Sequence, residues 1–222
     1  MPQTKIGVLG GTFNPIHSGH IHLANRVRRL FGLSSVHFVT AALPPHKPHR
    51  DLLALEHRYA MVCLATSGQP GFIPSLIELE RPQSPYSIDT LAKISRTAGT
   101  DASSIYFIAG ADSLAEVSGW HESGRLLTTY NFVFAARPGF LASPPGDCLP
   151  AGLERRVIDL RPPGATVPGR GKRPAIFVVE VAARRVSSSE IRALAAAGRD
   201  IGRLVPAPVR EYILKLNLYG ER

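Results

Sequence analysis

The chain has 222 residues, of which 44% are hydrophobic and 19% are charged, and its formal net charge is +9. This length is sufficient for one domain with a full hydrophobic core, and this composition excludes a disordered chain. No apolar run approaches the ~18 residues of a membrane-spanning helix, and residues 1–5 lack the layout of a secretion signal, so we expect a cytoplasmic protein without a membrane partner.

The sequence predicts, in chain order, a strand at 6–9, a helix at 18–31, a strand at 36–40, a helix at 55–67, a strand at 77–80, a helix at 87–98, strands at 105–109, 131–136 and 176–181, and helices at 187–197 and 208–216. Residues 44–50 contain three prolines and are predicted to be a loop. Strands that alternate with helices favour an α/β fold, a Rossmann-like doubly wound parallel sheet with helices on both faces.

Residues from about 138 to 174 differ from the rest in their content of proline, glycine and arginine. We interpret them as an irregular insertion that holds one short strand at 157–160. The remainder forms a continuous pattern without internal repeats, so we expect a single domain over residues 1–222.

The positive charge raises nucleic acid as a possible partner. The basic residues, however, are scattered in short groups, and no aromatic residues alternate with them to form a stacking platform. We therefore expect no nucleic-acid partner, and we attribute the charge to a polyphosphate ligand and to solvated surface arginines.

The loop from Gly10 to His20 reads G-G-T-F-N-P-I-H-S-G-H and lies between the first strand and the first helix. Glycines that lead into a helix N-terminus present backbone N–H groups and a positive dipole end, which together bind anions. The loop matches neither the dinucleotide pattern G-x-G-x-x-G nor the P-loop ending G-K-[ST].

His17 and His20 are placed where the predicted helix begins, and both can donate N–H bonds to phosphate oxygens. Two alternatives stay open at this point. One histidine could cap the helix while the other packs, or His17, His20 and His22 could bind zinc, although no nearby carboxylate or thiolate completes a ligand set. A second helix start is predicted at Ser187, where Glu190 follows three residues later as in a capping box.

These motifs resemble the two signatures of the HxGH nucleotidyltransferase superfamily. The first is the Gly10–His20 loop, and residues 186–192, V-S-S-S-E-I-R, resemble the second signature, I-S-S-T-x-I-R. Further segments over nearly the whole chain, except about residues 140–174, resemble the family of bacterial nicotinate-nucleotide adenylyltransferases. Asn14 stands where that family more often has Asp, Pro85-Tyr86-Ser87 where it has Ser-Tyr-Thr, and Ser189 where it has Thr.

The resemblance implies transfer of AMP from ATP to nicotinate mononucleotide, which yields deamido-NAD and pyrophosphate in NAD biosynthesis, with Mg²⁺ arriving on ATP and no metal held by the protein. It assigns the reacting phosphates to His17, His20 and Arg192. It assigns ATP binding to Gly10, Gly11, Thr12, Gly110, Asp112, Ser188 and Ser189.

For the acceptor, the resemblance assigns binding to Lys47, Ser87, Trp120, His121 and Arg137. Trp120, the sole tryptophan, would stack on the pyridine ring, although it could instead be a core aromatic. Lys47 and Arg137 would face the mononucleotide phosphate, although either could be a surface charge. The same chemistry on nicotinamide mononucleotide and a non-catalytic nucleotide-binding regulator are the alternative functions, and a homo-oligomer is possible.

Overall fold

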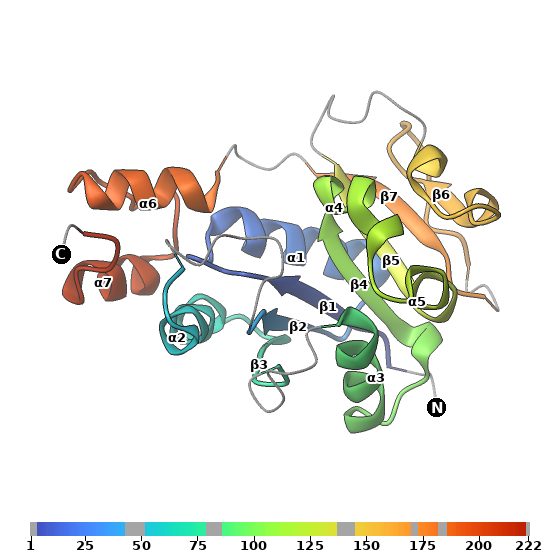
Figure 1. Ribbon diagram of the computed structural model, residues 1–222, viewed down its shortest axis with the longest axis horizontal. Helices are drawn as coiled ribbons and strands as arrows, with labels where there is room; N and C mark the ends of the chain where they lie inside the picture. Colours follow the sequence, from blue (N-terminus) through green and yellow to red (C-terminus); the bar gives the residue numbers. More distant parts are fainter. Residues whose placement is uncertain are drawn as a thin grey trace.

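The protein is described from a computed structural model, which describes residues 4–42, 52–78, 86–136, 145–169, 173–181 and 186–220. Its strands are β1 Ile6–Gly11, β2 Ser35–Thr40, β3 Phe72–Ser75, β4 Ile105–Gly110, β5 Asn131–Ala136, β6 Val157–Asp159 and β7 Ile176–Glu180. Its α-helices are α1 Ser18–Phe31, α2 Leu55–Thr66, α3 Ser87–Thr97, α4 Ala111–Glu116, α5 Ser123–Thr129, α6 Ser188–Ala196 and α7 Ala207–Lys215 (Figure 1).

The strands of the described chain form one sheet in the order β3-β2-β1-β4-β5-β7-β6, and every neighbouring pair is parallel. The order therefore reverses at β1, where β2 lies on one side and β4 on the other. In open parallel sheets, ligands bind beyond the carboxyl ends of the strands at this reversal. Gly11 and Gly110, the last residues of β1 and β4, mark that position.

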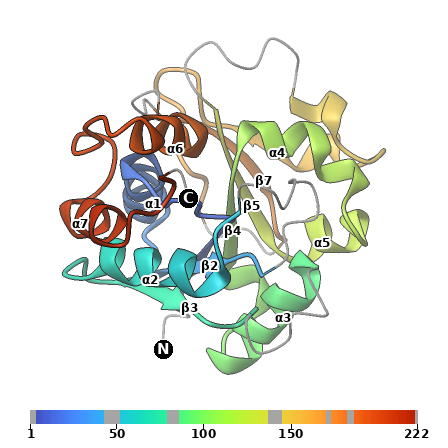
Figure 2. The same cartoon turned by 60° about the vertical axis from the view of Figure 1, so that its left-hand side comes forward.

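Helices cover both faces of the sheet, as the sequence predicts. Figure 2 shows α1, α2, α6 and α7 on one side and α3, α4 and α5 on the other. The side chains of β1 alternate accordingly: Leu9 belongs to the core under α1, whereas Val8 belongs to the core under α3. Both side chains are buried, so the sheet separates two hydrophobic cores and the predicted doubly wound α/β fold is confirmed.

The first helix follows the sequence rules closely. Ala24, Val27 and Phe31 are its buried residues, and Gly32 ends it with a φ of 61°, a left-handed conformation that glycine adopts without strain. At the other predicted helix start, the Ser187 hydroxyl accepts a 3.1 Å bond from the Glu190 backbone N–H. The predicted cap of α6 is therefore confirmed.

The strand predicted at 77–80 is wrong. The strand of this region is β3, and Ile77 and Glu78 lie in a turn after it, while residues 79 and 80 are outside the described chain. Pro74 lies within β3, which is the edge strand of the sheet. A proline is tolerated there because an edge strand does not need every backbone N–H for pairing.

The sequence also predicted no helix between residues 110 and 131, where the structure has α4 and α5. These helices have six and seven residues, too few to display a 3.6-residue apolar period. In the region of the predicted insertion, the expected short strand is present as β6, and the structure shows that it pairs with β7 at the sheet edge. The division of the chain into one domain stays a prediction.

Candidate active site

A cleft of about 1150 Å³ lies at the carboxyl ends of β1 and β4, where the strand order reverses. Its lining includes Gly10, Gly11 and Thr12 from β1 and the turn after it, and Gly110 from β4. Residues of the first turns of α1, α3 and α6 also line it. Three helix N-termini therefore open onto one cavity, an arrangement that favours negatively charged ligands.

The two histidines of the first loop stand against each other at the start of α1. Their rings stack with centroids 3.7 Å apart, and the His17 side chain is only 8% exposed. Phe13 packs its ring edgewise against His20 at 5.1 Å, and Phe13 itself is held at a φ of 48°. A buried, non-glycine residue in the left-handed region stores strain that the surroundings must offset, and such residues cluster at functional sites.

Gly19 of H-S-G-H has a packing role. A Cβ added at Gly19 would lie 3.0 Å from ring atoms of His17, tighter than ordinary van der Waals contact. Any larger residue at this position would therefore push the His17 ring away from its place beside His20. The spacing of the motif is required by the ring stack as well as by the helix start.

The hydrogen bonding of His20 determines which ring nitrogen carries its proton. The His17 backbone N–H donates to His20 Nδ1 over 3.2 Å, so Nδ1 is an acceptor. The neutral ring then carries its proton on Nε2. His20 therefore both satisfies a backbone donor at the helix start and presents an Nε2–H of the kind that binds phosphate oxygens.

The C-terminal part of the chain is fastened to this loop. Arg192 on α6 donates from Nη1 to the Asn14 carbonyl over 3.0 Å, and the Ser188 hydroxyl donates to the Pro15 carbonyl over 3.0 Å. The Ser18 hydroxyl and backbone N–H both donate to the Leu204 carbonyl, each over 2.9 Å. The N-termini of α1 and α6 are thus held together by bonds that span most of the sequence.

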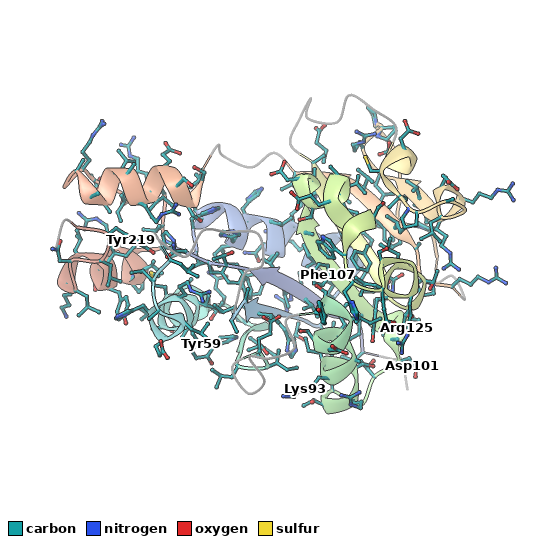
Figure 3. All side chains as sticks on the ribbon, viewed as in Figure 1. Tyr59, Lys93, Asp101, Phe107, Arg125 and Tyr219 are labelled. Atoms are coloured by element: carbon teal, nitrogen blue, oxygen red, sulfur yellow. The ribbon has the colours of Figure 1, made fainter. Side chains whose placement is uncertain are left out.

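Asn14 is the centre of these contacts. The Tyr219 hydroxyl donates to Asn14 Oδ1 over 3.0 Å, and the Leu53 backbone N–H donates to the same atom over 3.4 Å. Burial raises the pKa of Tyr219, so the phenol stays protonated and remains a donor. Figure 3 shows Tyr219 beside α6 and α7, at the end of the molecule away from Phe107 on β4.

Aromatic side chains form another part of the cleft lining. Trp120 is half-buried and meets Phe107 edge to face, with centroids 5.9 Å apart. Tyr86, the residue before α3, stacks on His121 at 4.0 Å with an angle of 22° between the rings. Trp120 and His121 line the cleft with Ser87, so this part of the lining offers an aromatic surface on which a flat ring could stack.

Most residues predicted for the site line the cleft, namely Gly10, Gly11, Thr12, His17, His20, Ser87, Gly110, Trp120, His121, Ser188, Ser189 and Arg192. Asp112, which is exposed on the first turn of α4, is not among them. Lys47 and Arg137 lie outside the described residues. The described chain contains no group of three or more potential metal ligands from His, Cys, Asp and Glu, which argues against the zinc alternative of His17, His20 and His22.

The sequence analysis gave no role at the site to several residues that support the cleft. Phe13 and Tyr86 could be read as ordinary aromatics, and Tyr219 showed no signal of its contact with Asn14. Glu78 lines the cleft, and burial raises the pKa of its carboxyl group above the ordinary value. Arg58 is only 1% exposed, and a fully buried arginine cannot be told from a surface arginine of a helix by sequence alone.

Comparison with known proteins decides the family. A model of the family described as cytidylyltransferase-like matches residues 8–194, which contain both histidines and Arg192. The chain belongs to this family. It is 37% identical over 98% of its length to a protein of Thermoanaerobacter sp. (strain X514) named probable nicotinate-nucleotide adenylyltransferase, of which 95% is covered.

A protein of the same name from Pelobacter propionicus is 39% identical over 98% of this chain and 99% of its own. The chain is thus a cytidylyltransferase-like protein of the nicotinate-nucleotide adenylyltransferase family, and the predicted resemblance is confirmed. Among solved structures, the nicotinic acid mononucleotide adenylyltransferase of Plasmodium falciparum complexed with NaAD superposes with a TM-score of 0.71 at 18% identity, covering 97% of both chains.

A putative nicotinate-nucleotide adenylyltransferase from Vibrio parahaemolyticus superposes with a TM-score of 0.61 at 18% identity, covering 99% of this chain and 97% of the other. At this identity the two structures show the fold of the family. None of the described helices in the present chain is long and apolar enough to cross a membrane.

Proposed function

We propose that this protein transfers AMP from ATP to nicotinate mononucleotide, giving deamido-NAD and pyrophosphate in NAD biosynthesis. The observation that carries the proposal is the convergence of the first turns of α1 and α6 on one cleft, with His17, His20 and Arg192 in its lining. The names of relatives that match nearly the whole chain indicate the acceptor.

The reaction needs little from the protein beyond position and charge. A phosphate oxygen of the mononucleotide forms a bond to the α-phosphorus of ATP, and the bond from that phosphorus to the oxygen bridging the α- and β-phosphates breaks. The electron pair leaves with pyrophosphate. Because the nucleophile is already an anion, no general base is required, and catalysis comes from in-line placement and from stabilising the charge that shifts to the leaving group.

We assign the triphosphate to the groups at the two helix starts. Gly10, Gly11 and Thr12 would offer backbone or hydroxyl donors, and Ser188 and Ser189 would bind the β- and γ-phosphates at the N-terminus of α6. His17 and His20 would contact the reacting phosphates, and Arg192 the leaving pyrophosphate. Gly110 would face the adenosine, and Asp112 stays a predicted ribose ligand although it does not line the cleft.

On the acceptor side, Trp120 would stack on the pyridine ring. Ser87 and the backbone near His121 would bind the nicotinate carboxylate, and backbone N–H groups there would favour the acid over the amide because they pair with an anion. Lys47 and Arg137 stay predicted partners of the mononucleotide phosphate. The half-buried position of Trp120 in the cleft lining supports this assignment over a purely structural aromatic.

Magnesium would enter with ATP. The described residues contain no cluster of three or more ligating side chains, so the proposal assigns the ion no ligand set from the protein. The ion would neutralise charge on the β- and γ-phosphates when bound.

The direct test measures pyrophosphate release from ATP with nicotinate mononucleotide and, in parallel, with nicotinamide mononucleotide. Rapid release with the acid and formation of deamido-NAD support the proposal. A clear preference for the amide would contradict the substrate assignment. Binding of ATP without turnover on either acceptor would instead favour the nucleotide-binding regulator. A cytoplasmic location and the possible homo-oligomer stay predictions from the sequence.

A further inference from the structure

Arg58 lies near the start of α2 and is almost completely buried, with 1% of its surface exposed. Its guanidinium donates to four backbone carbonyls. These bonds run from Nε to Leu53 at 3.0 Å, from Nη1 to Thr12 at 2.9 Å and to Ala41 at 2.7 Å, and from Nη2 to Ala42 at 3.3 Å.

None of these four acceptors carries a formal charge, so these hydrogen bonds do not form a salt bridge between the guanidinium and a carboxylate. Burial of a cation is costly, and burial lowers the pKa of Arg58, which the negative charges of Glu56 and Glu78 partly oppose. The contacts fix the relative positions of three backbone segments. The planar guanidinium joins Thr12, in the turn after β1, to Ala41 and Ala42 on one side of residues 43–51 and to Leu53 on the other side.

The Glu78 carboxylate binds the same backbone segment, at the N–H group of Ala42. Its Oε2 accepts from the Ala42 backbone N–H over 3.2 Å, and its Oε1 accepts from the Thr90 hydroxyl on α3 over 3.2 Å. Glu78 and Thr90 both line the cleft. The carboxylate therefore joins the end of β2 to the helix whose first residue is Ser87.

Together these contacts account for every backbone polar group of Ala41 and Ala42. The Ala41 N–H donates to the Gly11 carbonyl over 2.9 Å, both carbonyls accept from Arg58, and the Ala42 N–H donates to Glu78. Three of the four groups are bonded to charged side chains. The bond to the Ala41 carbonyl is short at 2.7 Å, and the two bonds to Ala42 are 3.2 and 3.3 Å long. Every backbone donor and acceptor of this dipeptide is therefore held by a partner.

We propose that Arg58 and Glu78 are positioning residues, which set the phosphate-binding turn at Thr12 and the acceptor-side helix α3 at a fixed distance through the Ala41–Ala42 peptide. The proposal rests on the proposed function, because it concerns the alignment of the two substrates of that reaction. A misplacement of about 1 Å between reacting groups can lower a rate by about 100-fold.

The test uses three variants and two controls in the full chain. R58K keeps the charge but loses the fork, and E78A removes the acceptor of the Ala42 N–H. E78Q keeps an oxygen for that N–H and an amide that can donate to the Thr90 hydroxyl. E211A and R96K remove an exposed carboxylate and an exposed guanidinium from α7 and α3 as controls.

We expect kcat with the better acceptor to fall by about 10- to 100-fold in R58K and E78A, with KM for ATP within about threefold of wild type. E78Q and both controls should stay within about threefold of wild-type kcat. This split and the rescue by E78Q would not follow from a merely structural role, which would lower the amount of folded enzyme and leave the kcat of the folded fraction unchanged.

A second measurement does not depend on turnover. Hydrogen–deuterium exchange should show a protected Ala42 amide in wild type and E78Q and faster exchange in E78A, with circular dichroism unchanged. If wild type is inactive on both acceptors but the Ala42 amide exchanges faster in E78A, the proposed function fails, whereas the role of Glu78 in holding Ala42 is supported. If wild type is active and R58K and E78A keep the kcat of the controls, or if E78A leaves the Ala42 amide protected, the positioning role is refuted.

Discussion

Two properties of His20 can be separated by substituting it with asparagine, glutamine and alanine. In the structure, His20 Nδ1 accepts the His17 backbone N–H over 3.2 Å, which leaves Nε2–H as the ring donor that we assign to phosphate. Asparagine places an oxygen near the position of Nδ1 and has no donor that reaches as far as Nε2. Glutamine places an amide N–H near the position of Nε2. Alanine removes both groups.

The two losses have different sizes. Loss of one preorganised donor to a developing charge costs about 2.7–4 kcal/mol, a fall in kcat of about 100- to 1000-fold. Loss of the bond to the His17 N–H costs about 1 kcal/mol of stability, which corresponds to about 2–4 °C in Tm for a chain of this length. All three variants lose the stacking on His17 and the edge contact with Phe13, so these contributions cancel in the comparison.

We therefore expect H20N and H20A to lose activity alike, H20N to melt about 2–4 °C above H20A, and H20Q to retain more activity than H20N. Pyrophosphate release and thermal unfolding measure these quantities, and exposed His22 gives the matched control H22A. H20N with wild-type kcat/KM would show that Nε2–H is no phosphate donor. Equal Tm values for H20N and H20A would refute the bond to His17.

Three further outcomes are expected. R192K loses the planar fork that holds the Asn14 carbonyl at 3.0 Å, so kcat/KM for ATP should fall by about 10- to 100-fold; an unchanged value would remove Arg192 from the phosphate site. Y219F removes the donor to Asn14 Oδ1 and should lower the free energy of unfolding by about 1 kcal/mol in urea denaturation, whereas no change would mean that water replaces the hydroxyl. Burial raises the pKa of Glu78, with the Ala42 N–H, Thr90 and Arg58 partly opposing it, so the folded protein binds this proton more tightly than the unfolded chain. Wild-type stability therefore falls as pH rises through the unfolded and then the folded pKa. The Tm of E78Q relative to wild type should increase as pH rises above the ordinary glutamate pKa of about 4.3, and a constant difference would contradict the sign.

The site was predictable from the sequence where its signals are local. The Gly10–His20 loop predicts the end of a strand, a glycine turn and a helix start within a few residues. Ser187 and Glu190 predict the second helix start. Each of these local structures depends on contacts between residues that are close in the sequence, so the residue types are enough to predict its geometry. The alternation of strands and helices likewise indicated a parallel sheet with its binding edge at the reversal of strand order.

Contacts between distant parts of the chain could not be predicted in this way. Tyr219 and Asn14 are 205 positions apart, and Arg58 is 46 positions from Thr12, so no local pattern pairs them. The strand at Phe72–Ser75 escaped prediction because only its place at the sheet edge makes Pro74 acceptable. The sequence by itself determined which residues begin α1 and α6, the two helices whose first turns line the cleft together with the glycine loop. Only the tertiary structure decided how far apart those helices stand, because that distance depends on buried side chains whose partners are chosen by packing of the whole chain.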